Sequence, residues 1–494
     1  MRLALLTKIA RWLPWVILLL MLGAALRLVN LGAPPLDFHP TRQLRNALVA
    51  RAIYYDSDAH ADPQKRGLAD SFRRAVGQYE PPILETIVGS TFLLIGGESF
   101  AVARVYNTLF WLLAGIALFD LARRIASPAS GLVSLTYFLV LPFGVQASRS
   151  FQPDPLMTSA FVLGIYFLYR WSEEQRWRWA VLGAVFAGFA ALVKIVIVFL
   201  IASGASAIVL HTLGRRFWKS AQVWTMVILM AAPAVAYYLL GNPARSTEYF
   251  FAWTVDLIRI IASPHFYADW LGFVGSLVGL TVLFLSLVGI GLASSRSRWL
   301  LIGLWAGYLL YGLMLPFQMF THSYYHLQLV PLIALGLGLV TEALVVSGRG
   351  LKRVWQTAML VPVLVFTAYQ AWVARSALVA EDFSAAPGLW ETIGEAIPEN
   401  ADVIALTQDY GFDLMYWGWH KVRLWPLTTA LSQIRADDRE LAVRFVELTA
   451  GNDYFLVTAF GQLESQPTLA AALDGYSVAD EGEGYILYDL NAPK

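Results

Sequence analysis

The chain contains no cysteine and few charged residues. The absence of cysteine among its 494 residues excludes disulfides, thiolate catalysis and cysteine-based metal sites. Only 14% of the residues are charged, against about 25% in typical soluble domains. Lysine plus arginine nearly balances aspartate plus glutamate, 36 against 35, so nothing points to a nucleic-acid partner. Apolar side chains are abundant instead, at 57% of the residues, which predicts a polytopic α-helical membrane protein.

Apolar segments of about 20 residues are long enough to cross a hydrocarbon core. Short cytoplasmic loops carry an excess of lysine and arginine, and the basic clusters here can all be cytoplasmic only if the chain crosses about eleven times. The N-terminus is then inside and the C-terminus outside. The first segment lacks a cleavage pattern before Arg27, so we expect it to be retained. The predicted spans are about 12–29, 103–124, 130–148, 155–171, 179–194, 195–212, 222–240, 270–293, 299–317, 326–346 and 354–373.

This alternation predicts that one long loop, about 30–101, lies on the outer face. Its apolar piece Pro82–Ile95 is too short for a comfortable span, so we expect it to lie on the outer surface or dip into it. The other segments expected outside are 148–154, 241–269, 318–325 and 374–494. Most candidate polar residues fall on these segments, which indicates a single reaction face.

The start of the long loop combines an acid, an imidazole and several arginines directly behind the first span. Residues 41–55 show the pattern of a basic amphipathic helix lying in the membrane interface. The apolar stripe holds Leu44, Leu48, Ala52 and Tyr55, and the arginines off that stripe are Arg42, Arg45 and Arg51. Such a helix could bind the anionic head group of a lipid substrate. The alternative is that these arginines pair with ordinary phospholipid phosphates.

Two charged residues stand within or beside apolar segments. Lys194 interrupts the run from Ala191 to Val198, and a charge in the membrane costs several kcal/mol unless it is paired or solvated. We expect it to face a polar cavity, with snorkelling to the outer interface as the alternative. Asp154, between two prolines, precedes a span, so an N-cap role explains it as well as acceptor or metal binding does.

The segment around His322 and His326 has the i, i+4 spacing of one helix face, which would also hold Gln318 if the helix began early. The same spacing is used for metals. Because the segment offers no acidic ligand, we favour hydrogen bonding of phosphate or sugar by Tyr325 and His326 over metal binding.

Six short motifs, in this order along the chain, resemble the GT-C superfamily of polyprenyl-phosphate-sugar-dependent glycosyltransferases. The resemblance is to its family-39 branch, related to protein O-mannosyltransferases and the aminoarabinose transferases of lipid A, and it covers about residues 10–375. One departure is that many relatives carry Asp-Glu after the first span, whereas here Asp37 is followed by Phe38. The motifs are Leu36-Asp-Phe-His-Pro-Thr-Arg-Gln43, Gln78-Tyr-Glu-Pro-Pro82, Ala103-Arg104, Ser148-Arg-Ser-Phe-Gln-Pro-Asp154, Leu192-Val-Lys194 and His322-Ser-Tyr-Tyr-His326.

The resemblance implies a GT-C fold and an inverting transfer from a polyprenyl-phosphate-linked sugar to a hydroxyl of a lipid, glycan or protein acceptor. Such a transfer needs a base for the hydroxyl proton and cations for the departing phosphate. Asp37 is the expected base, with Glu80 as its rival and Asp154 as a third candidate catalytic carboxylate; a helix-capping role for Asp37 is the alternative. The resemblance leaves use of a divalent cation open. The expected substrate-binding residues are His39, Arg42, Gln43, Arg149, Lys194, His322, Tyr325 and His326.

Charged residues return after Val373, which predicts a small external α/β domain over 374–494, following a membrane domain over 1–373. Segments 403–407, 454–458 and 485–488 are typical of buried strands, and 431–448 has helical spacing. We expect Trp417, Trp419 and Trp425 to form a core or docking surface, with contact to sugar as the alternative. Two other functions stay open, a lipid-linked glycan polymerase or ligase and a polyprenyl-lipid flippase or transporter, although a transporter would place polar residues along the depth of several spans.

Overall fold

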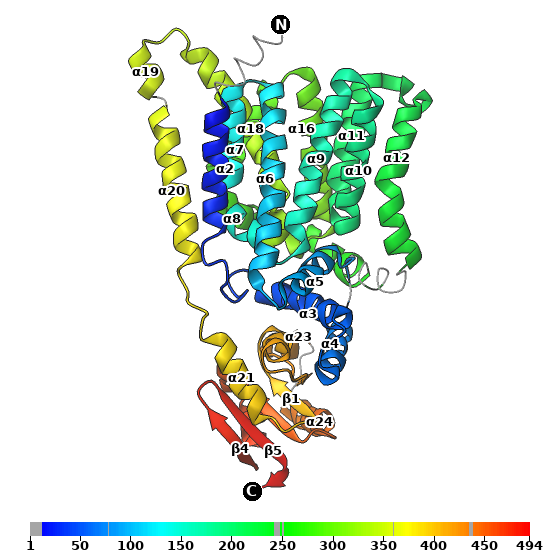
Figure 1. The fold of residues 1–494 in the computed structure, drawn as a ribbon, viewed down its shortest axis with the longest axis vertical. Coiled ribbons are helices and arrows are strands. Elements are labelled where there is room, and N and C mark those ends of the chain that lie inside the picture. Colours follow the sequence, from blue (N-terminus) through cyan, green and yellow to red (C-terminus); the bar gives the residue numbers. More distant parts are fainter. Residues whose placement is uncertain (1–11, 78, 242–247, 249–250, 359, 434–437) are drawn as a thin grey trace. The chain divides into compact units, whose positions relative to one another are not determined.

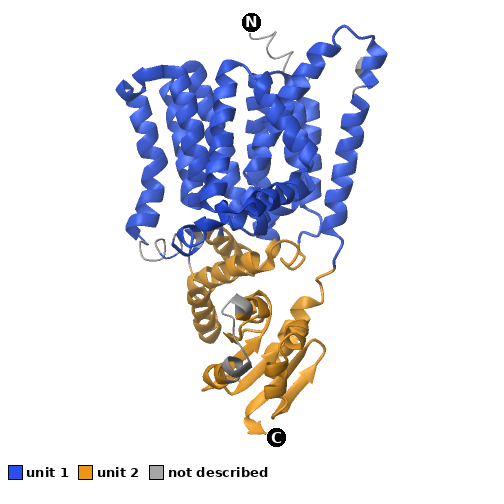
Figure 2. Ribbon diagram, turned by 180° about the vertical axis from the view of Figure 1, so that it is seen from behind, with its two compact units in different colours: residues 1–31, 78–84, 101–381 blue, residues 32–77, 85–100, 382–494 orange. Residues whose placement is uncertain are grey.

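The structure, a computed structural model, describes the chain except residues 1–11, 78, 242–247, 249–250, 359 and 434–437. It divides into two compact units. Unit 1 holds residues 1–31, 78–84 and 101–381, and unit 2 holds residues 32–77, 85–100 and 382–494 (Figure 2). The long loop therefore belongs mainly to the same unit as the C-terminal segment, although it is separated from it in sequence by the helices of unit 1.

Unit 1 is a bundle of helices that run side by side (Figure 1). Its α-helices are α2 (Leu13–Arg27), α6 (Phe100–Ile125), α7 (Pro128–Val140), α8 (Pro142–Arg149), α9 (Pro153–Glu174), α10 (Trp177–Val193), α11 (Val198–Leu213), α12 (Ala221–Ala234), α14 (Pro264–Val278), α15 (Leu280–Leu292), α16 (Ser295–Met314), α17 (Gln318–Thr321), α18 (Leu329–Gly348), α19 (Arg353–Ala358) and α20 (Leu360–Leu378). The 3-10 and π segments are η1 (Ile195–Ile197), η2 (Gly214–Lys219), η3 (Val235–Gly241), η4 (Phe251–Val255), η5 (Ile258–Ala262) and η6 (Ser323–His326).

Close helix contacts in unit 1 use small residues. Helix α15 packs on α18, and a Cβ added to Gly289 would lie 2.2 Å from the carbonyl oxygen of Gly336. The two backbones therefore touch only because both positions are glycine. Small residues at such contacts are typical of helix packing in membranes, where burial of apolar surface drives association little. The other large helix contacts are α9 with α10, α10 with α12, α11 with α16, and α7 with α18.

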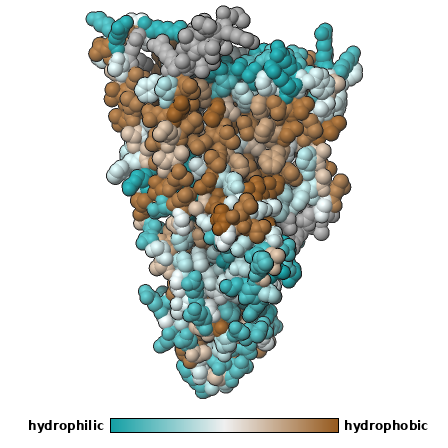
Figure 3. Space-filling view, viewed as in Figure 1, coloured by the Kyte–Doolittle hydropathy of each residue, from teal (hydrophilic) through white to brown (hydrophobic). Residues whose placement is uncertain are grey.

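This is a multi-pass membrane protein. Among the residues that the structure describes, five helices are long and apolar enough to cross a membrane, or up to seven if each of two bent pairs is one span. All eleven predicted spans coincide with helical segments, but eleven crossings remain a prediction, because several of these helices are short or carry charges. Figure 3 shows apolar side chains gathered over the helices of unit 1 on the face in view. The five helices are Phe100–Ile125, Ile195–Lys219, Ala221–Gly241, Ser323–Gly348 and Arg353–Leu378.

Two of the predicted spans are formed by bent pairs of helices. Helices α7 and α8 meet at 62°, and α14 and α15 meet at 96°. The first break lies at Pro142, which has no backbone N–H and forces Leu141 out of the helical region. The second lies at Gly279, whose φ of +83° is accessible to glycine at low cost. Both breaks fall inside predicted spans, 130–148 and 270–293, and whether each bent pair crosses as one span stays a prediction.

Unit 2 combines helices with one mixed five-stranded sheet, in the order β2-β1-β3-β5-β4. Strand β1 is parallel to β2 and β3, whereas β5 is antiparallel to β3 and β4. The strands are β1 (Val403–Leu406), β2 (Arg423–Leu424), β3 (Tyr454–Val457), β4 (Tyr476–Gly482) and β5 (Tyr485–Pro493). The helices are α3 (Pro40–Ser57), α4 (Pro63–Val76), α5 (Ile83–Ile95), α21 (Ala386–Ala396), α22 (Phe412–Tyr416), α23 (Thr428–Gln433), α24 (Asp438–Thr449), α25 (Phe460–Glu464) and α26 (Pro467–Leu473).

The three predicted strands are confirmed as β1, β3 and β5, and α23 and α24 occupy the predicted helical stretch on either side of the undescribed residues 434–437. Trp425 lies in the core of the sheet with Phe445 and Phe455, which confirms the prediction of a core position for this tryptophan. Strands β2 and β4 were not predicted. Both are largely exposed, so they lack the continuous apolar run that identified the other three.

Helix α3 confirms the helix predicted over 41–55 but corrects its environment. Residues 43–52 are all buried, so the helix does not present a basic face to lipid. Arg45 donates to the carbonyl oxygen of Gly77 at 2.9 Å, and Arg51 pairs with Glu98. The expectation that both arginines face lipid phosphates is therefore wrong. An amphipathic pattern cannot distinguish a membrane interface from a protein core that also supplies charged partners.

Candidate active site

A buried ion pair lies in unit 1 where α10 ends. Helix α10 stops at Val193, and Lys194 has extended backbone angles, φ −154° and ψ 115°, before η1 begins. Its ammonium Nζ lies 2.8 Å from Oδ1 of Asp154, and the two side chains are only 4% and 3% exposed. An isolated buried charge would cost folding free energy, so each of the two residues stabilises the charge of the other. The burial of Lys194 and its pairing with Asp154 contradict the snorkelling alternative, and the polar cavity stays a prediction.

Asp154 lies in the first turn of α9, but it is not the N-cap residue. That position belongs to Gln152, and Asp154 directs Oδ1 toward Lys194. Its N-cap alternative is therefore wrong.

Two tyrosines complete the surroundings of Lys194. The Lys194 ammonium lies 4.7 Å from the ring centre of Tyr324 and 4.4 Å from that of Tyr325, within the range of cation–π attraction. Both tyrosines are buried and belong to η6. The predicted substrate-binding residues Lys194 and Tyr325 are thus brought together, and the Asp154 carboxylate of α9 pairs with the Lys194 ammonium.

Several buried polar atoms of α9, at Asp154 and after it, have no hydrogen-bond partner within the described part of the chain. They are Oδ2 of Asp154 and the hydroxyls of Thr158 and Ser159, all buried. Thr158 lies one helical turn after Asp154, so the two side chains share a face of α9. Leaving buried polar groups unpaired is costly, typically about 1–3 kcal/mol each. Such a concentration is characteristic of a site that completes its hydrogen bonds with a ligand or water.

Three fully buried arginines lie at helix ends in unit 1. Arg149 ends α8 and donates to the carbonyl oxygen of Asn30 at 3.1 Å, which also accepts a bond of 3.1 Å from Arg104 of α6. Arg27 ends α2 and donates to the hydroxyl of Ser148 at 2.7 Å. All three are at most 1% exposed. The structure thus gathers three cations where Arg149 alone was predicted as a substrate ligand.

Arg27 and Arg104 were missed by the sequence reasoning. Arg104 stood in a recognised motif without a role, and Arg27 was read as the end of the first span. The signal that could have identified them is a charge within or beside a long apolar segment, the same signal that identified Lys194.

The two histidines do not share a helix face. His322 has φ −128° and ψ 102°, which separates α17 from η6, so the expected i, i+4 pair does not form. His326 is fully buried, with Nδ1 2.7 Å from the hydroxyl of Tyr308 and Nε2 3.0 Å from the carbonyl oxygen of Met319. Binding of phosphate by His326 stays a prediction, and it would require one of these two bonds to open.

Four predicted site residues of unit 2 lie at the start of α3. Asp37 precedes the helix, His39 is its N-cap residue with φ +49°, and Pro40 is its first residue. The side-chain amide of Gln43 holds this turn, because it donates to the carbonyl oxygen of Phe38 at 2.8 Å and to Oδ1 of Asp37 at 3.2 Å. Gln43 is itself fully buried and Arg42 is half-buried. Asp37 is therefore oriented by the side chain predicted to bind substrate.

A turn of the C-terminal segment contacts α3 next to these residues. The hydroxyl of Thr41 donates to Oδ1 of Asp409 at 2.6 Å. Asp409 and Tyr410 both have positive φ, at +50° and +58°, which is uncommon for residues with side chains. Asp413, one turn later, is buried, and burial together with the Asp409 carboxylate raises its pKa to about 7. Neither aspartate was predicted, because both lie outside every recognised motif.

Glu80 lies in an irregular stretch before α5 and is half-buried in unit 1. The predicted catalytic carboxylates are thus divided, with Glu80 and Asp154 in unit 1 and Asp37 in unit 2. Among the residues the structure describes, no three histidines, aspartates or glutamates are grouped as a metal site would require.

Comparisons with known proteins agree with the resemblance seen in the sequence. Residues 80–240 match the family model described as dolichyl-phosphate-mannose-protein mannosyltransferase. No curated protein sequence matches the chain. The fold is similar to that of ArnT from Cupriavidus metallidurans bound to undecaprenyl phosphate, with a TM-score of 0.60 and 14% identity over 96% of this chain and 98% of that one.

The fold is also similar to that of the archaeal oligosaccharyltransferase AglB from Archaeoglobus fulgidus, in complex with an inhibitory peptide and a dolichol-phosphate. That match has a TM-score of 0.55 and 13% identity, and it covers 95% of this chain and 73% of AglB. At such identities, the two likenesses concern the fold. They support a GT-C-like helical architecture with a small C-terminal mixed sheet.

Proposed function

We propose that this chain, whose residues 80–240 match a family model of polyprenyl-phosphate-sugar-dependent glycosyltransferases, transfers a sugar from a polyprenyl phosphate to an acceptor hydroxyl with inversion. The hydroxyl oxygen attacks the anomeric carbon while the bond from that carbon to the phosphate oxygen breaks. The proton passes to a carboxylate, and polyprenyl phosphate leaves. The acceptor is a lipid, a glycan or a protein, and membrane lipids surround unit 1.

The observation that carries this proposal is the buried Lys194–Asp154 pair with its unsatisfied polar neighbours. A departing phosphate develops negative charge, which a fixed cation in a water-poor site stabilises strongly. Lys194 supplies that cation, and Tyr324 and Tyr325 provide aromatic surfaces beside it. The buried arginine Arg149 is the second proposed phosphate ligand. The solved ArnT structure holds undecaprenyl phosphate, a donor carrier of the class we propose here.

For the base, we propose Asp37, with Glu80 as the rival. Gln43 orients the Asp37 carboxylate at 3.2 Å without adding a charge that would neutralise it. His39, Arg42 and Gln43 are proposed to contact substrate from the same turn. Asp154 is less suited to the role of base, because its charge is engaged by Lys194.

The direct test is transfer by the purified full chain in lipid nanodiscs, assayed with a panel of radiolabelled polyprenyl-phosphate sugars and of lipid, glycan and peptide acceptors. Asp37→Asn should lower turnover by roughly 10²–10⁴-fold, since it removes the general base but keeps the side-chain shape. Donor binding should not change. Asp70→Asn is the matched control, because Asp70 is an exposed carboxylate of α4 paired only with Arg73 and Arg74.

The same assay separates the rival assignments. Full activity of Asp37→Asn together with an inactive Glu80→Gln would assign the base to Glu80. If both variants transferred every sugar normally, the glycosyltransferase mechanism proposed here would be wrong.

We also propose that the reaction face is extracytoplasmic. The absence of cysteine in the native chain makes single introduced cysteines specific probes. Asn400→Cys should react with an impermeant maleimide added outside intact cells, and Gly350→Cys should not. The reverse pattern would overturn this orientation.

A further inference from the structure

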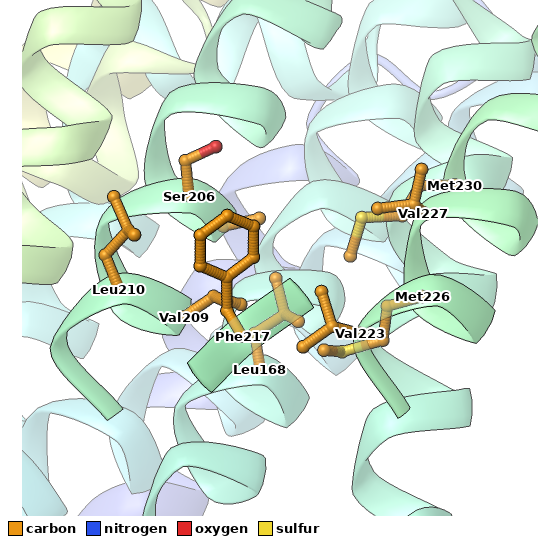
Figure 4. Close-up of a pocket in the computed structure, with 10 residues that line it drawn as sticks. Leu168, Ser206, Val209, Leu210, Phe217, Val223, Met226, Val227 and Met230 are labelled. Atoms are coloured by element: carbon orange, nitrogen blue, oxygen red, sulfur yellow. The ribbon is translucent and has the colours of Figure 1, made fainter. Parts of the chain in front are cut away.

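Helices α11 and α12 are consecutive, yet they do not pack directly against each other over their length. Helix α11 packs on α16, and α12 packs on α10. Between them lies an apolar cavity of about 190 Å³, with Leu168 of α9 among its lining residues (Figure 4). All its lining side chains but one are apolar, the exception being Ser206.

The connection between these helices closes one end of the cavity. It is the 3-10 helix η2, and its Phe217 reaches into the space between the side chains of α11 and those of α12 (Figure 4). On α11, Leu210 lines the cavity while remaining 48% exposed, and on α12 Val227 does so while remaining 47% exposed. The cavity is thus a groove that opens along the lipid-facing side of the two helices.

The same short helix carries a concentration of positive charge. Arg215, Arg216 and Lys219 are all exposed. Beside them, Trp218 is 57% exposed and its ring lies 4.9 Å from the ammonium of Lys219. Trp224 at the start of α12 is also exposed, at 53%. Exposed tryptophans and basic residues at a helix end are typical of the level of lipid head groups.

The η2 cations differ from those of two other basic turns in unit 1. Arg123 and Arg124 are neutralised by Asp120, and Arg176 and Arg178 lie near Glu174. For Arg215, Arg216 and Lys219, no carboxylate lies within 4 Å in the described residues. A general need for basic residues in such loops explains the charges, but it does not explain their position at the mouth of an apolar groove.

We propose that the groove and the η2 cations together form a binding site for one anionic phospholipid. One acyl chain lies in the groove against Leu168 and Met226, and the phosphate-bearing head group lies against Arg215, Arg216 and Lys219. The apolar lining alone would accept any lipid tail. The uncompensated charge selects an anionic head group, because each Lys or Arg near such a surface adds attraction. This site is separate from Lys194 and Asp154 and does not depend on the proposed transfer reaction.

The test uses the full chain, released from nanodiscs of phosphatidylcholine and phosphatidylglycerol with identical acyl chains and analysed by native mass spectrometry. We expect the wild type to retain phosphatidylglycerol selectively. The triple variant R215Q/R216Q/K219Q should retain it at least about tenfold less. The matched control R349Q/K352Q/R353Q removes three cations from another basic turn, between α18 and α19, and should retain it like the wild type.

A second variant probes the groove itself. Ser206→Phe fills the apolar space and leaves the cations in place, so it should also lose the retained phosphatidylglycerol, and its thermal unfolding shows whether it is folded. Equal loss in the control triple variant would overturn the proposal in favour of general electrostatic attraction. Equal retention of phosphatidylcholine, or displacement of the lipid by undecaprenyl phosphate alone, would overturn the proposed occupant.

Discussion

Two ion pairs, the buried Lys194–Asp154 pair in unit 1 and the partly buried Arg51–Glu98 pair in unit 2, differ in their surroundings. Around Asp154, several buried polar atoms have no partner in the described residues. Arg51, by contrast, is fully engaged. Its Nε lies 2.9 Å from Glu98, its guanidinium lies 3.8 Å from the ring centre of Tyr416 and 4.3 Å from that of Trp419, and it also donates to the Tyr416 carbonyl oxygen.

This difference in surroundings indicates that the two ion pairs have different roles. The hydroxyl of Tyr416 donates to Glu98 at 2.8 Å, which closes the network around Arg51. A network that satisfies all its members rigidifies the fold, and here it joins α3, the segment after α5, and α22. A pair with unsatisfied neighbours is instead prepared for a ligand. Unit 2 uses its buried charge for structure, and we infer that unit 1 uses its own for chemistry.

The largest effect is expected for Lys194→Met. Transfer should fall about 10²–10³-fold, as for loss of one charge-stabilising group. Folding should also suffer by about 3–5 kcal/mol, because Asp154 is left as an unpaired buried charge. Thermal unfolding and single-turnover transfer measure the two losses separately. The double variant Lys194→Met/Asp154→Asn should recover stability but not transfer. Recovery of both would show that this pair, too, is only structural.

A purely structural effect is expected for Arg51→Met. Unit 2 should lose about 3 kcal/mol of stability, because Glu98 loses its partner, and hydrogen exchange should quicken in residues 40–57 and 412–416. At temperatures where the variant is folded, turnover should stay within about twofold of the wild type. The stability of Arg51→Lys should lie between those of the wild type and Arg51→Met, since lysine keeps the charge but not the planar contacts of the guanidinium. A large loss of turnover in the folded variant would remove the contrast between the two pairs.

A pH effect is expected from Asp413 in unit 2. Burial and Asp409 raise its pKa to about 7, above its value in the unfolded chain, so the folded state binds the proton more tightly. Stability from this group is therefore present at low pH and is lost as the pH rises toward 7, with a slope of at most about 1.4 kcal/mol per pH unit. Asp413→Asn should flatten this dependence in thermal unfolding between pH 4 and pH 7. The exposed Asp474→Asn serves as the control and should retain the wild-type slope.

The smallest effect is expected for Asp70→Asn. Asp70 pairs with Arg73 and Arg74 on the surface of α4, where solvent screens the charges. Surface ion pairs typically contribute about 0–1 kcal/mol, so unfolding should shift by less than 1 kcal/mol. A larger shift would mean that exposure is a poor guide to the strength of ion pairs in this molecule.

The recognised motifs were located correctly, and their partners were not. Lys194 was identified because a lysine in an apolar run is costly wherever the chain places it. Its partner Asp154 lies 40 residues away, and no periodicity connects them. The misjudged helix α3 shows the same limit, because its arginines find Gly77 and Glu98 through folding. The contact of α3 with lipid was expected from the pattern of neighbouring residues, whereas the observed partners of its arginines are distant in the sequence.

The sequence by itself determined that this chain spans a membrane, where its helices fall, which strands are buried and which family it resembles, because hydrophobicity, periodicity and motif order are properties of consecutive residues. Only the tertiary structure decided that spans break at Pro142 and Gly279, that the long loop joins the C-terminal segment in one unit, and that Lys194 faces Asp154. These outcomes depend on contacts between distant residues. Their energies, from buried charge pairs to close backbone packing, exist only once the chain has folded.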